Sequence, residues 1–94
     1  EGEKHETITR SFLEVAMLNF YNIVEEIPRG KRIFRVNITA DAHRISEFLM
    51  FLFESGIATE VEGAVHRTSF WASFELRHQK KIEAWLHENN IDPE

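Results

Sequence analysis

The chain has 94 residues, a formal net charge of −5 at pH 7, 43% hydrophobic residues and no cysteine. This length fits one small domain, and the apolar content is enough to build a core, so a wholly disordered chain is excluded. The lack of cysteine excludes a disulfide framework, a zinc ribbon and a thiol nucleophile, and no apolar run approaches the ~18 residues of a membrane span. We expect a single domain over 1–94, with 1–8 as a flexible N-terminal segment.

The segment before the first strand is ambiguous. Ser11-Phe12-Leu13-Glu14 fits a capping box, which predicts a short helix over 9–18. The alternative is a single long strand that continues into the first hairpin.

Pro28 and Gly30 mark the turn of that hairpin. Proline presets φ at the second position of a turn, and glycine takes the left-handed position that follows. This predicts a three-residue loop with a bulge between strands at about 19–27 and 31–39. The cross-strand pairs that this turn predicts are Glu26–Arg32, Val24–Phe34, Asn22–Val36 and Phe20–Ile38.

A helix is predicted over 42–55, with Asp41 as its N-cap and Gly56 as its C-terminal glycine. Its apolar residues at helical spacing are Ile45, Phe48, Leu49, Leu52 and Phe53. Every residue from Phe48 to Phe53 is apolar, whereas a helix that packs on one sheet needs only a stripe of apolar residues. Met50 and Phe51 therefore require a second surface, either the N-terminal segment or a partner chain.

A second hairpin is predicted around Gly63 and Ala64, because apolar and polar residues alternate on both sides of them. Its strands fall at about 57–63 and 67–76. Residues 78–90 then predict a last helix, whose inward residues are Ile82, Trp85 and Leu86.

These elements predict an α+β fold, a two-layer sandwich with a four-stranded antiparallel sheet and (α)ββαββα order. The helices can connect these strands if the strands lie in the order 1-2-4-3. The fourth strand then lies between the second and the third, as in a split βαβ unit. The layout resembles a ferredoxin-like sandwich whose last strand has moved to the front of the chain.

No enzyme motif is present in the sequence. It has no Walker glycine loop, no G-x-S-x-G and no G-x-G-x-x-G, and a small domain seldom encloses a closed pocket. Its five histidines form neither H-E-x-x-H nor another established ligand spacing. We expect no catalytic residue, no metal site and no cofactor.

A basic stretch surrounds the first turn, with the four bases Arg29, Lys31, Arg32 and Arg35. The first three are candidate contacts for an anion. The alternative is that Glu25 and Glu26 neutralise this charge across the hairpin, because exposed cross-strand charge pairs are ordinary. The net charge of −5 argues against a generic nucleic-acid binder, whose surface must neutralise phosphates.

The sheet face turned away from the core is expected to be rich in aromatic and apolar side chains. Alternation places on it Tyr21, Ile23, Ile33, Arg35, Asn37, Trp71, Ser73 and Glu75. A large apolar patch usually marks a contact. Three occupants compete for it: the N-terminal helix, a second copy of the chain, and nucleic-acid bases that stack on Trp71 and Tyr21.

From these features we expect a small non-catalytic protein-interaction or regulatory module that self-associates through the sheet face or the helix 42–55. The expected partner contacts are Tyr21, Ile23, Ile33, Arg35, Met50, Phe51 and Trp71. The expected partner is another protein, a second copy above all, with nucleic acid a weaker candidate and no membrane. The alternative is a small-ligand or nucleic-acid-binding domain that uses the open sheet face and the basic hairpin. A small anion would then bind at the helix start, between Thr39 and Arg44.

Overall fold

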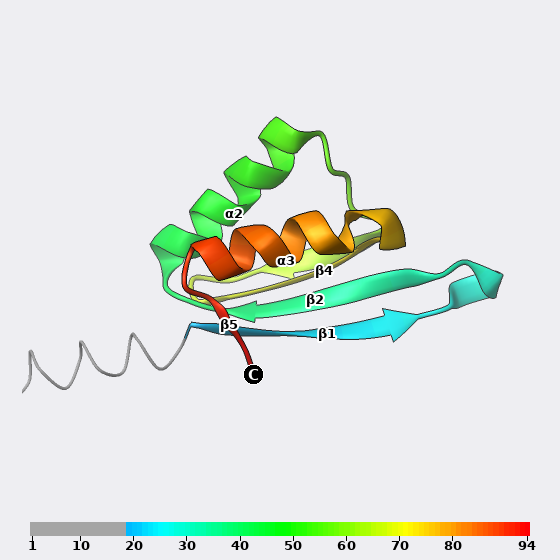
Figure 1. The fold of residues 1–94 in the computed structure, drawn as a ribbon, viewed down its shortest axis with the longest axis horizontal. Coiled ribbons are helices and arrows are strands. Elements are labelled where there is room, and N and C mark those ends of the chain that lie inside the picture. Colours follow the sequence, from blue (N-terminus) through cyan, green and yellow to red (C-terminus); the bar gives the residue numbers. More distant parts are fainter. Residues whose placement is uncertain (1–18) are drawn as a thin grey trace, which may run out of the picture.

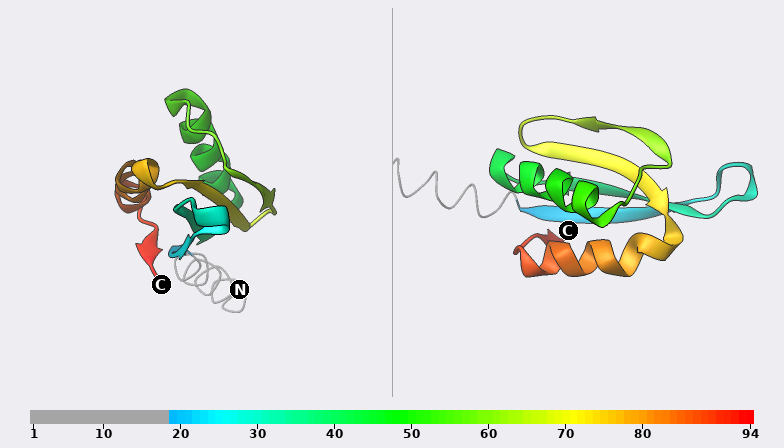
Figure 2. Two further views of the ribbon diagram at one scale, coloured as in Figure 1. Left: turned by 90° about the vertical axis from the view of Figure 1, so that its right-hand side faces the viewer. Right: turned by 90° about the horizontal axis from the view of Figure 1, so that it is seen from above.

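The computed structural model describes residues 19–94 (Figure 1), so the helix expected over 9–18 and the flexible segment 1–8 lie outside the described residues. Five strands form one sheet: β1 (Phe20–Glu26), β2 (Ile33–Thr39), β3 (Val61–Val65), β4 (Ser69–Glu75) and β5 (Asp92–Pro93). Two helices, α2 (Ala42–Ser55) and α3 (Gln79–Glu88), lie on one face of this sheet, as Figures 1 and 2 show. The protein is therefore an α+β domain with a layer of helices on a layer of strands.

The sheet has the strand order β3-β4-β2-β1-β5. Its four longer strands are antiparallel neighbours in the predicted order, but the chain returns to the sheet after α3 and adds β5 parallel to β1. The N–H of Glu94 donates to the carbonyl oxygen of Tyr21 at 2.8 Å, and Ile91, just before β5, is fully buried. The prediction of a four-stranded, wholly antiparallel sheet is therefore wrong.

The loop between β1 and β2 is longer than the three residues predicted, because the last pair of the ladder is Glu26 with Ile33. Arg29 and Gly30 both have left-handed backbones, with φ of 54° and 82°. The N–H of Lys31 donates to the carbonyl oxygen of Pro28 at 2.9 Å, which closes a 3-10 turn at the tip.

This loop shifts the pairing of β1 by one residue from the predicted register. Tyr21 lies opposite Ile38, and Ile23 lies opposite Val36. A shift of one residue moves every side chain of a strand to the other face of the sheet. Tyr21 and Ile23 therefore face the helices, and their predicted place on the open face is wrong.

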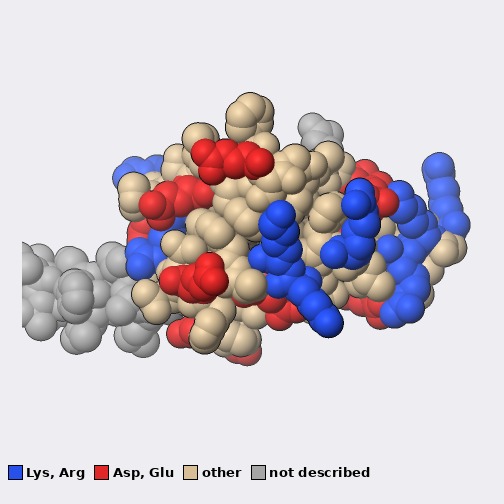
Figure 3. Space-filling view, turned by 45° about the horizontal axis from the view of Figure 1, so that its top comes forward, with Lys and Arg blue, Asp and Glu red and all other residues tan. Residues whose placement is uncertain are grey.

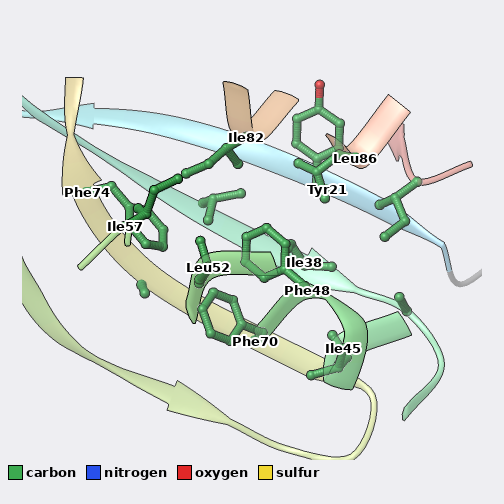
Figure 4. Close-up of a cluster of buried hydrophobic side chains, with 14 of the residues drawn as sticks. Tyr21, Ile38, Ile45, Phe48, Leu52, Ile57, Phe70, Phe74, Ile82 and Leu86 are labelled. Carbon is green, nitrogen blue, oxygen red and sulfur yellow. The ribbon is translucent and has the colours of Figure 1, made fainter. Parts of the chain in front are cut away.

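The core fills the space between the sheet and the helices (Figure 4). Phe48 of α2 lies at its centre, with its ring centroid 5.2 Å from that of Phe70 and 5.4 Å from that of Trp85. The fully buried side chains around it include Phe34, Val36, Phe74, Ile82 and Leu86. Burying aromatic and branched side chains of this size is the main stabilising contribution to such a domain.

Helix α2 begins and ends at the predicted residues. The Asp41 carboxylate accepts a hydrogen bond from the N–H of Arg44 at 2.9 Å, and Gly56 ends the helix with a left-handed backbone. The buried side of α2 is narrower than predicted, because its buried residues are Ile45, Phe48 and Leu52. Leu49 and Phe53, which were expected in the core, are exposed.

The second hairpin turns later than predicted. Gly63 lies inside β3, and the turn is at 66–68, where the N–H of His66 donates to the carbonyl oxygen of Ser69 at 2.8 Å. A Cβ atom at Gly63 would stand 2.2 Å from the carbonyl oxygen of Trp71. This glycine therefore permits the close approach of β3 to β4, where the ladder also changes register.

Replacing the helix cap should weaken the whole domain. We expect Asp41→Ala to lower the free energy of unfolding by about 1 kcal/mol, because a helix N–H loses its side-chain acceptor. Asp41→Asn is the control: asparagine caps helices about as well, so this variant should keep the cap and lose only the contribution of the charge. Equal unfolding free energies of Asp41→Ala and the wild type in urea at pH 7 would contradict the assignment.

The same cap predicts a pH dependence. The hydrogen bond from the N–H of Arg44, together with its guanidinium, holds the pKa of Asp41 below the usual value. A lowered pKa in the folded state stabilises the fold above the pKa of the unfolded chain, and this contribution is lost as the pH falls through the lowered value. The advantage of the wild type over Asp41→Asn in urea unfolding should therefore shrink in acid.

Candidate functional site

The open face of the sheet is covered at its centre by its own charged side chains. Arg35 projects from β2, with its guanidinium carbon 4.6 Å from the centre of the Trp71 ring and its Nη2 3.1 Å from Oε2 of Glu26. Ser73 Oγ donates to Oε1 of the same carboxylate at 3.3 Å. Ile33 pairs with Glu26 on this face and is only 1% exposed. Arg35 and Trp71 thus lie together as predicted, while Ile33 offers almost no surface to a partner.

A second set of hydrogen bonds runs from β2 across β1 to the end of the chain. Asn37 Nδ2 donates to Oδ1 of Asn22 at 2.8 Å, and Asn22 Nδ2 donates to Oε1 of Glu94 at 2.8 Å. These amides lie on the side of the sheet where Tyr21 and Ile23 were expected. The open face is consequently much more polar than the sequence indicated.

Tyr21 and Ile23 belong to the helix-bearing side. Tyr21 is 7% exposed, and its hydroxyl donates to Oε1 of Glu83 on α3 at 3.1 Å; Ile23 packs against the edge of the core. Both residues are therefore structural contacts between β1 and the helix layer. Their assignment to a bare aromatic sheet face is wrong because it depended on the shifted register.

The basic hairpin is largely paired within the chain. Lys31 Nζ lies 3.0 Å from Oε1 of Glu60, and Arg32 Nε donates to Oε2 of Glu25 at 3.0 Å. Of the four bases, Arg29 is the one without an ion pair among the described side chains, those of 19–60 and 63–94. Figure 3 shows Lys and Arg side chains at the hairpin end of the molecule, and others over its middle and at the opposite end. Of the three bases expected to contact an anion, Arg29, Lys31 and Arg32, only Arg29 is therefore unpaired among the described side chains.

The start of α2, proposed above for a small anion between Thr39 and Arg44, already holds a carboxylate. Asp41 accepts from the N–H of Arg44, and the Arg44 guanidinium donates to its second oxygen at 2.8 Å. Arg44 Nε also donates to the carbonyl oxygen of Asn89 at 3.0 Å, which ties the start of α2 to the end of α3. The chain itself therefore fills this position.

The largest exposed apolar side chains of the helix layer gather on α2. Phe53 is 82% exposed, Met50 55% and Leu49 37%. Met50 was predicted to need a second surface, and Leu49 and Phe53 were missed as contact residues. The unbroken apolar run from 48 to 53 was the signal that could have found them, since it leaves apolar side chains on the outer side whichever way the helix turns.

A hollow of about 300 Å³ lies between α2 and α3, beside this apolar surface. Phe51 and Trp85 are half-buried in it, with ring centroids 5.4 Å apart and planes at 20°. The residues that line the hollow are Glu47, Met50, Phe51, Glu54, Trp85 and Asn89. We call it the α2–α3 groove. It combines an aromatic lining with two exposed carboxylates, one of which, Glu47, lies 3.3 Å from Nε2 of His43.

Among the side chains that the structure describes, no three of His, Asp or Glu converge as metal ligands would. None of the helices in this part of the chain is long and apolar enough to cross a membrane. Comparison with protein-family models, curated proteins and solved structures found no match.

The contact between Tyr21 and Glu83 can be measured directly, because Tyr21 is the one tyrosine of the chain. Burial and the hydrogen bond to the Glu83 carboxylate raise the pKa of Tyr21 above its usual value. We expect near-ultraviolet absorbance to show that the Tyr21 phenol ionises at a higher pH than a free tyrosine. Glu83→Gln should lower the pKa of Tyr21. Glu88→Gln, on the exposed side of the same helix, is the control and should leave it unchanged. A Tyr21 that titrates as free tyrosine would show that the contact is not made in solution.

Proposed function

We propose that this protein is a small non-catalytic protein-interaction module that self-associates through the exposed side of α2. The observation that carries the proposal is Phe53, a phenylalanine 82% exposed in the last turns of a capped helix. Met50 and Leu49 extend the apolar surface along the same helix. Contiguous apolar surface of this kind usually marks a contact with another protein.

The size of this surface indicates how far the contact must extend. Burying what remains exposed of Phe53, Met50 and Leu49 would contribute about 3 to 5 kcal/mol. Association costs about 4 to 15 kcal/mol in lost freedom of motion. From one copy, the three side chains reach only the lower limit of that cost, so we expect a stable contact to include neighbouring surface such as the α2–α3 groove.

The pairing of charges favours a protein partner over nucleic acid. Lys31 and Arg32 are engaged by Glu60 and Glu25, and Arg35 lies over the Trp71 ring where a base would stack. Phosphate binding needs free positive charge and base stacking needs an open ring. Of the bases expected to hold an anion, Arg29 alone keeps its charge unpaired among the described side chains, which supports the nucleic-acid or small-ligand alternative less well.

We also propose that the fold is a ferredoxin-like layout with one strand inserted. From β2 to β5 the chain runs strand, helix, two strands, helix, strand, and β1 lies between β2 and β5. This order supports the layout, but a shared fold does not indicate a shared activity.

Light scattering tests the self-association. We expect a mass above the 11.1 kDa of one chain, and Phe53→Asp should return it to that of one chain because a charge replaces the apolar contact. Val24→Asp is the matched control: Val24 is 48% exposed and pairs with Arg35 on the open face of the sheet, opposite the helices, so the variant should keep the wild-type mass. A wild type that stays monomeric at high concentration would refute the proposal, and dissociation by Trp71→Glu would move the contact to the sheet face.

A further inference from the structure

The β1–β2 hairpin projects beyond the helices at one end of the molecule (Figures 1 and 2). At its tip Ile27 is 59% exposed. Arg29, two residues further on, has no ion pair within the described part of the chain. The left-handed turn at Arg29 and Gly30 holds this tip in a defined shape. The tip therefore presents an apolar side chain close to a free positive charge.

The α2–α3 groove has the complementary chemistry. Its lining is apolar at Met50, Phe51 and Trp85, and it carries the carboxylates of Glu47 and Glu54. These two glutamates are two helical turns apart, about 10 Å along the same side of α2. In Figure 3 several acidic side chains lie around the uncharged surface of the helix layer, away from the hairpin end. An apolar side chain with an adjacent base complements this groove in polarity and in charge.

We propose that the hairpin tip of one copy enters the α2–α3 groove of the next copy. Ile27 would pack against Met50, Phe51 and Trp85, and Arg29 would pair with the carboxylates beside them. This inference rests on the self-association proposed above and names the second surface that the contact requires. Because the hairpin extends away from the helices, a copy cannot fill its own groove (Figure 2).

A contact between two α2 helices is the competing arrangement, and its charges are less favourable. It would bring Glu47 and Glu54 of both copies onto one apolar surface. The bases of α2 are His43 and Arg44, and Arg44 is already held by Asp41. Like charges that face each other across an interface oppose association, whereas the hairpin brings a base to the acids.

When the tip of one copy enters the groove of the next, the two partners contribute different surfaces, which makes the contact heterologous. Copies then add head to tail, and a copy with only one intact surface can still bind at one end of the assembly. This property separates the inference from any symmetric dimer.

The test mixes two variants, each with one surface damaged. Ile27→Asp removes the apolar tip, and Met50→Asp puts a charge into the groove; both positions are exposed, so both variants should fold. We expect each variant alone to have the mass of one chain. An equal mixture should have the mass of two chains, because the intact groove of the first accepts the intact tip of the second.

The outcomes of this test are distinct. If the wild type associates and Ile27→Asp associates equally well, the hairpin inference is overturned while self-association stands. If both variants are monomeric and their mixture stays monomeric, the contact is symmetric and the inference is again overturned. If the wild type is itself monomeric, the proposed function fails and this inference fails with it.

Charge reversal gives a second, independent readout. Arg29→Glu should raise the Kd of self-association about fivefold, the magnitude of one exposed ion pair, and Glu54→Lys in the same chain should restore it. Arg67→Glu, at an exposed base in the β3–β4 turn, is the matched control and should have no effect. An equal response to Arg29→Glu and Arg67→Glu would mean that net charge acts on association and that Arg29 makes no specific contact.

Discussion

The pairing of β1 with β2 decides which surfaces this domain presents. With Tyr21 opposite Ile38, the tyrosine ring enters the helix layer and its hydroxyl reaches Glu83. The same register turns Glu26 to the open face, where its carboxylate contacts Arg35 and Ser73. A slip of one residue would reverse both placements, because successive side chains point to opposite sides of a strand. One alignment thus both buries an aromatic side and makes the other side polar.

Because the open face of the sheet is polar, the exposed apolar surface lies mainly on the outer side of α2. The rotation of α2 is set by Phe48, whose ring is enclosed by Phe70 and Trp85. Once that side is buried, the outer side must carry Met50 and Phe53, because a helix with an unbroken apolar run cannot bury all of it against one layer. The same packing brings Phe51 beside Trp85 and forms the aromatic part of the α2–α3 groove. The surface and the groove are two results of one packing arrangement.

Capping and alternation made much of the fold predictable, whereas only part of the candidate site could be predicted. Met50 was expected to need a second surface, and the apolar run of α2 indicated why. Phe53 was placed in the core because both sides of such a run look alike in the sequence. The groove could not be foreseen, since its glutamates and its tryptophan come from two helices whose contact depends on the whole core. Ile27 was read as part of a strand, and only the longer loop places it at an exposed tip.

The sequence by itself determined the types of the elements, the ends of α2 and the order of the four longer strands. These follow from interactions within a few residues, such as the Asp41 cap and the Gly56 turn, and from short connections between alternating segments. The tertiary structure alone decided the β1 register, the addition of β5 and the outward side of α2. Each of these depends on which distant side chains fill the core. Two residues such as Asp92 and Pro93 carry no strand pattern of their own and become a strand only because Ile91 is buried beside β1.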